Sequence, residues 1–93
     1  MKLLLAIVAF EDAEPMIDAL LGREYRVTRL NTASGWLRRG NVTLLIGAEE
    51  AQVDDVINTL RAHCRRRPPA EVKPCAAACA VVFVLDVPRF ERI

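Results

Sequence analysis

The chain has 93 residues, 53% of them hydrophobic, and a formal net charge of +1. A chain of this length forms one domain with a modest core, and its apolar content excludes a disordered tail. The near-neutral charge argues against a general nucleic-acid-binding protein, which would carry a strongly basic surface. We therefore expect one domain over residues 1–93 and no nucleic-acid partner.

The first ten residues, MKLLLAIVAF, resemble the apolar part of a signal peptide. No small-residue cleavage site follows, and the acidic run EDAE comes at once, so we expect a buried strand instead. No apolar run reaches the roughly 20 residues that a membrane helix needs. The chain has three cysteines, and an odd number is not expected in the disulfide framework of a small secreted protein. We therefore expect a cytoplasmic protein with reduced thiols and no membrane partner.

The spacing of apolar residues predicts four strands and two helices. The strands are expected at residues 2–10, 25–31, 41–49 and 80–87, and the helices at residues 12–22 and 52–64. Pro15 is tolerable only if it lies in the first turn of its helix. Gly22 suits the end of the same helix, because glycine readily adopts the left-handed conformation found there.

The order β-α-β-β-α-β predicts an α+β fold of the ferredoxin-like type, with a four-stranded antiparallel sheet and two helices on one face. In such a sheet the uncovered face is normally polar, which makes the strands alternate. The segments LLLAIVAF and VVFVLDV are instead apolar on both faces. We therefore expect a homo-oligomer that buries the second face, with cyclic closure as the usual arrangement.

The stretch RVTRLNTASGWLRRGNVTLLIG, residues 26–47, is the most unusual part of the chain. It holds four arginines, the only tryptophan and three of the four glycines, and it has no acidic residue. Arginines can donate to phosphates, an aromatic ring can stack on a base, and the amide of Asn41 can pair with an adenine edge. These residues alone are consistent with a nucleotide site. They are equally consistent with ordinary structural roles, in which the glycines form a turn, the arginines are solvated and the tryptophan packs against other side chains.

Together with VVFVLDVPRFERI, residues 81–93, this stretch resembles the cyclic-di-AMP receptor family of small bacterial PII-like signal-transduction proteins. The members are ferredoxin-like homotrimers that bind one cyclic-di-AMP at each of three clefts between neighbouring subunits and catalyse no reaction. The resemblance therefore implies a PII-like homotrimer, a cyclic-di-AMP ligand and an unidentified downstream protein partner. A homotrimer would also bury the second apolar face of the strands.

The resemblance implies seven ligand-binding residues: Arg26, Thr28, Gly35, Trp36, Leu37, Asn41 and Gly47. Arg26 would lie near a phosphate. Thr28 and Asn41 would contact a base or a phosphate.

Trp36 stands where the family usually has phenylalanine, and with Leu37 it would pack against an adenine. Gly47 would let the base or the backbone come close. Ala78 and Cys79 replace a glycine pair that the family often has before its last strand, where a long loop helps to close the site. Here that loop is short and broken by prolines. A Cβ at either position could obstruct the ligand's close approach.

Alternatives from other classes stay open. One is a PII-like trimer without a nucleotide that acts as a protein-interaction module, and another is an ATP or ADP sensor. A third is a zinc module using His63, Cys64, Cys75 and Cys79, although the adjacent His63 and Cys64 point about 100° apart on a helix. An enzyme is not expected, because there is one histidine and no known catalytic motif. No cofactor is implied, and Asp86 is expected to make a structural hydrogen bond.

Overall fold

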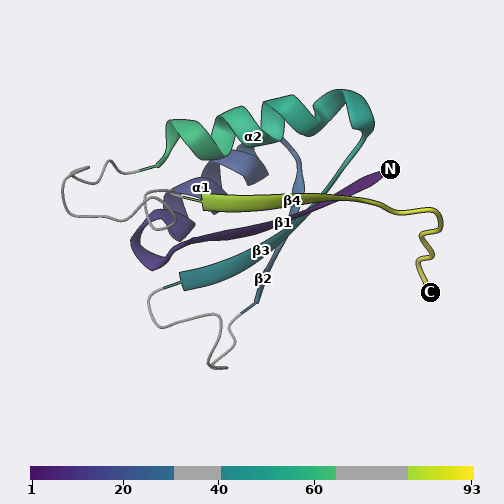
Figure 1. Ribbon diagram of the computed structural model, residues 1–93, viewed down its shortest axis with the longest axis horizontal. Coiled ribbons are helices and arrows are strands. Elements are labelled where there is room, and N and C mark those ends of the chain that lie inside the picture. Colours follow the sequence, from purple (N-terminus) through teal and green to yellow (C-terminus); the bar gives the residue numbers. More distant parts are fainter. Residues whose placement is uncertain (31–40, 65–79) are drawn as a thin grey trace.

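The computed structural model describes residues 1–30, 41–64 and 80–93. Its elements in chain order are β1 (Lys2–Ala9), α1 (Phe10–Gly22), β2 (Arg26–Leu30), β3 (Asn41–Ala48), the short 3₁₀ helix η2 (Glu50–Gln52), α2 (Val53–Ala62) and β4 (Ala80–Asp86). The strands form one antiparallel sheet in the order β2-β3-β1-β4, and both helices lie on the same side of it (Figure 1). The expected ferredoxin-like α+β fold is confirmed.

The core lies between the helices and one face of the sheet. Alternate residues of β1 and β3 point into it, as the two-residue period of a strand requires. These residues are Leu4, Ala6 and Val8 from β1, and Val42, Leu44, Ile46 and Ala48 from β3. The helices contribute Ala13, Met16, Leu20, Val56 and Leu60. Each large apolar side chain that is fully buried here stabilises the fold by about 1.5–3 kcal/mol.

The opposite face of the sheet, here called the open face, is also largely apolar. Its rows follow from the strand register: Leu5 of β1 lies opposite Leu45 of β3 and Phe83 of β4. The side chains of Val81, Phe83 and Leu85 are 45%, 50% and 46% exposed. Among the described residues no helix covers this face. The expectation that the strands are apolar on both faces is therefore confirmed.

Helix α1 begins earlier than expected, and this changes the position of its proline. Phe10 is the first helical residue rather than the end of the preceding strand. Pro15 therefore lies in the second turn, and the prediction that it falls in the first turn is wrong. Proline has no N–H for the helical hydrogen bond to the residue four positions earlier. Pro15 is exposed, so its ring adds nothing to the core.

Helix α1 ends at Gly22, as predicted, but the left-handed residue is not Gly22. Gly22 is the last helical residue, and the left-handed conformation occurs two residues later, at Glu24, with φ of 69°. The N–H of Tyr25 donates to the carbonyl of Leu20 at 3.0 Å, and the N–H of Glu24 donates to that of Leu21 at 2.9 Å. These two bonds define a Schellman motif. A glutamate thus occupies the position that usually prefers glycine.

We predict that Gly22→Ala raises the free energy of unfolding by about 0.5–1 kcal/mol, because alanine favours a helix over glycine. An added Cβ at Gly22 meets nothing within 4 Å. Glu24→Gly should also be stabilising, by roughly 1 kcal/mol, because it removes the strain of a side chain in the left-handed region. Urea denaturation measures both. Destabilisation by Gly22→Ala would contradict the observed helix end.

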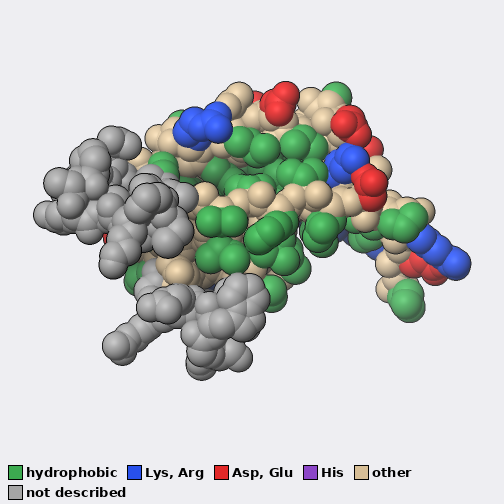
Figure 2. Space-filling view, in the orientation of Figure 1, with side chains coloured by type: hydrophobic (Ala, Val, Ile, Leu, Met, Phe, Trp, Pro, Cys, Tyr) green, Lys and Arg blue, Asp and Glu red, His purple; other side chains and the backbone are tan. Residues whose placement is uncertain are grey.

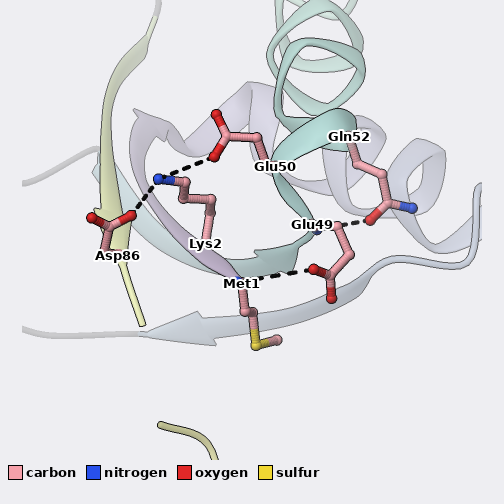
Figure 3. A network of polar contacts seen from close by, with 6 residues as sticks. All are labelled: Met1, Lys2, Glu49, Glu50, Gln52 and Asp86. Carbon is pink, nitrogen blue, oxygen red and sulfur yellow. Dashed lines mark hydrogen bonds and ion pairs between the residues drawn. The ribbon is translucent and has the colours of Figure 1, made fainter. Parts of the chain in front are cut away.

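Charged groups join the ends of three segments at one end of the sheet (Figure 3). The Lys2 ammonium forms an ion pair with Asp86 of β4 and lies 3.3 Å from a carboxylate oxygen of Glu50. The side chain of Gln52 accepts from the Glu49 N–H at 2.8 Å, which completes a capping box at η2. The expectation of a structural hydrogen bond at Asp86 is confirmed.

These contacts move two pKa values in opposite directions. The hydrogen bond from Lys2 holds the pKa of Asp86 below its usual value of 3.8. The hydrogen bonds to Asp86 and Glu50 raise the pKa of Lys2 above 10.5. The Asp86 carboxylate therefore contributes stability above its unfolded pKa, and that contribution is lost as the pH falls through its folded pKa.

We predict that Asp86→Asn lowers stability at neutral pH and that the deficit shrinks as the pH falls through and below the ordinary carboxyl value of 3.8. Chemical denaturation at a series of pH values from 7 downward measures this difference. Glu91→Gln is the control, because the partner of Glu91 is Arg89, only two residues away. An Asp86→Asn deficit that does not change with pH would exclude the ion pair as its cause.

Candidate functional site

The structure describes four of the seven residues expected to bind the ligand: Arg26, Thr28, Asn41 and Gly47. The other three, Gly35, Trp36 and Leu37, lie outside the described residues. The strand register decides how the four are arranged, because it sets which residues share a face and which lie opposite one another.

Three of the four lie together on the open face. Arg26 of β2 is opposite Gly47 of β3, and Thr28 is opposite Leu45. Arg26 and Thr28 are exposed, and Gly47 is partly buried. A guanidinium and a hydroxyl therefore stand beside a position that has no side chain. We call Arg26, Thr28 and Gly47 the β2 strip.

Gly47 leaves a gap in the open face rather than permitting an unusual backbone. Its φ does not lie in the left-handed region, so conformation alone does not require glycine there. A Cβ added to it would lie 3.3 Å from the Cε of Met1, the flexible end of a half-exposed side chain. The gap can therefore admit a ligand atom close to the backbone.

Asn41 lies apart from the β2 strip. It is exposed and begins β3, on the same face as Gly47 but six residues earlier in the strand. At about 3.3 Å per residue, the two are separated by roughly 20 Å. The described candidates thus form two groups near opposite ends of β3 within one chain.

Arg29, which could also donate to a phosphate on sequence grounds, faces the other way. It belongs to the helix side of β2, where its guanidinium lies 3.6 Å from the Glu14 carboxylate and 5.7 Å from the centre of the Phe10 ring. Its side chain is only 27% exposed. Arg29 therefore fastens β2 to α1 and does not belong to the β2 strip.

The start of β2 is held by a hydrogen bond next to Arg26. The Tyr25 hydroxyl donates to Asp55 of α2 at 2.7 Å, and Arg23 donates to the same carboxylate at 2.9 Å. The hydrogen bond to Asp55, followed by burial, raises the pKa of Tyr25. This contact ties the strand that carries Arg26 and Thr28 to the helix layer. Sequence analysis did not identify it, because the two partners are 30 residues apart.

Two of the four residues of the metal alternative, His63 and Cys64, lie within the described ranges. Within the described ranges no cluster of three or more His, Cys, Asp or Glu residues could hold an ion, and Cys75 and Cys79 lie outside those ranges. His63 Nδ1 lies 3.0 Å from the Thr59 carbonyl oxygen near the end of α2, so this nitrogen carries the proton and donates. Cys64 is disulfide-bonded, so the expectation of reduced thiols is wrong at this position.

No helix in the described part of the chain is long and apolar enough to cross a membrane.

Comparison with known proteins identifies the same family that the sequence resembles. The family model described as "Cyclic-di-AMP receptor" matches residues 1–77. A crystal structure of a functionally unknown protein from Pediococcus pentosaceus ATCC 25745 is similar, with a TM-score of 0.77 and 34% sequence identity. The similarity covers 99% of this chain and 96% of that one. With the family match spanning most of the sequence, this chain belongs to the cyclic-di-AMP receptor family.

Proposed function

We propose that this chain is a non-enzymatic PII-like signalling protein of the bacterial cytoplasm that binds cyclic-di-AMP in clefts between the subunits of a homotrimer. The β2 strip carries the proposal: a cation, a hydroxyl and a gap in the surface lie side by side on an exposed face, in a member of the receptor family. These groups suit a ligand that has phosphates and flat bases.

The composition of the open face supports a trimer with its sheets packed inward. The β1 and β4 portion of this face is apolar, with Leu3, Leu5, Ile7, Val81, Phe83 and Leu85. Water-exposed apolar area of this kind commonly marks a contact with another chain. Arg26 and Thr28 lie on β2, an edge strand, and so at the border of that apolar area. A ligand bound there would lie at the boundary between subunits.

The separation within β3 supports a site shared between copies. Gly47 lies opposite Arg26, but Asn41 of the same chain is too far from both to form a single cluster with them. In a cleft between two subunits, Asn41 of one copy could face the β2 strip of the next. We propose that Arg26 meets a phosphate and that Thr28 and Asn41 contact base or phosphate. Trp36 and Leu37 would pack on an adenine beside Gly35.

Titration calorimetry tests the proposal directly, with cyclic-di-GMP and ATP as control ligands. We expect saturable binding of cyclic-di-AMP alone, at about one ligand per chain, by a protein that sedimentation shows to be trimeric. Absence of binding by a trimeric protein would reject the ligand and favour the interaction module. The replacement of the family's glycine pair by Ala78 and Cys79 already points toward that second function. A monomeric protein would reject the trimer.

We predict that Gly47→Ala weakens cyclic-di-AMP binding at least tenfold while changing the stability of the free protein little. The new methyl group would fill the gap that the ligand approaches, and the nearby Met1 Cε can move aside. Gly22→Ala is the matched control, because it makes the same chemical change at the end of α1, away from the open face. Unchanged affinity of Gly47→Ala would exclude close approach at this position.

A further inference from the structure

The helix layer has a hollow on its surface, between the second halves of α1 and α2. Its volume is about 270 Å³. Sites for whole small-molecule ligands are usually larger, roughly 300–1,000 Å³, and enclose most of the ligand. A space of this size on an open surface suits a single side chain instead. We call it the helix hollow, and it is lined by Ala19, Arg23, Asn58, Thr59, Ala62 and His63.

Small side chains make the space available. Ala19 of α1 and Ala62 of α2 each contribute only a methyl group to the lining. The Thr59 hydroxyl donates to the Asp55 carbonyl at 2.7 Å, so it is already satisfied within α2. Longer side chains at these positions would fill the groove between the two helices. The hollow therefore offers apolar surface to the methylene groups of an incoming side chain.

Two polar side chains of the hollow are held in position with N–H groups to spare. The Arg23 guanidinium donates to Asp55 at 2.9 Å, and a guanidinium has further N–H donors. The Asn58 side-chain oxygen accepts from Arg61 at 2.9 Å, which leaves the NH₂ group as its free end. Asp55 and Asn58 are three residues apart and so lie on the same face of α2. The two sets of donors are therefore neighbours.

The charges around the helix hollow favour an anionic side chain. None of its described lining residues is acidic. The lining and its direct partners carry two arginines, Arg23 and Arg61, and one aspartate, Asp55. The second oxygen of Asp55 also accepts from the Tyr25 hydroxyl, at 2.7 Å. Figure 2 shows a basic side chain over the last turns of α2, with acidic side chains nearer its beginning.

We propose that the helix hollow receives a glutamate side chain of a partner protein. The carboxylate would accept charge-assisted hydrogen bonds from Arg23 and a hydrogen bond from the Asn58 amide. Its two methylene groups would cover Ala19 and Ala62, whereas aspartate, with one methylene fewer, would leave part of this surface bare.

The inference goes beyond the proposed function and does not depend on the trimer or its ligand, because both helices belong to one chain. Both helices lie on the side of the sheet away from the open face (Figure 1). In the proposed trimer, with its sheets packed inward, the helix hollow would remain accessible to another protein.

NMR titration of the isotope-labelled protein with a capped glutamate, N-acetyl-glutamic acid N-methylamide, tests the proposal. We expect saturable shifts of the backbone amides of Arg23, Asn58 and Ala62, with a Kd on the order of 1 mM, as is typical for a ligand of this size. The corresponding capped glutamine should bind about fivefold more weakly, because it lacks the charge. Equal binding of the two compounds, or no saturable shift at these amides, would overturn the proposal. A response to inorganic phosphate alone would overturn it in favour of a small-anion site.

Two substitutions provide the second test. Ala62→Leu fills the helix hollow from an exposed position and should weaken binding of the capped glutamate by roughly tenfold. Arg23→Gln removes the charged donor and should weaken it by about fivefold. Ala51→Leu, the same change as the first at an exposed position before α2, is the control and should bind like the wild type. Unchanged affinity of Ala62→Leu would overturn the proposal. All three variants should bind cyclic-di-AMP as the wild type does, and a wild type that does not bind it would reject the proposed function alone.

Discussion

Strand β1 lies inside the sheet, and both of its faces are apolar. It pairs with β3 on one side and β4 on the other. Its residues Leu4, Ala6 and Val8 are buried under the helices, and Leu3, Leu5 and Ile7 point to the open face. Both described helices lie on one side of this four-stranded sheet and leave its other face uncovered. The uncovered apolar face is therefore the constraint on which the proposed oligomer, cleft and site all depend.

Two polar side chains of the open face lie where that constraint allows them. Arg26 and Thr28 are on β2, an edge strand, next to the gap at Gly47. A charged side chain in the middle of the apolar face would have to lose its water without a partner, at a considerable cost in free energy. At the edge it can remain hydrated until a phosphate replaces the water. In the proposed trimer, the same surface would thus serve both for contact between subunits and for binding an anion.

Most of the fold could be predicted from apolar periodicity, because long amphipathic segments carry a strong signal. The start of α1 and the left-handed residue after its end could not. Phe10 is apolar and continues the pattern of the first strand, so nothing local marks it as the start of a helix, and Pro15 was misplaced as a result. The left-handed residue is Glu24 rather than Gly22. The Schellman hydrogen bonds that stabilise it end at Tyr25, whose hydroxyl is held by Asp55 across the helix layer.

The sequence alone determined the order of the elements, the two apolar faces and the family, because these follow from residue types at short spacings. Only the tertiary structure decided which candidates meet. It placed Arg26 opposite Gly47, turned Arg29 toward Glu14 on the other face, and separated Asn41 from both. The reason is that a shift of one residue in strand pairing moves every side chain to the opposite face. That register is set by contacts between residues distant in the sequence.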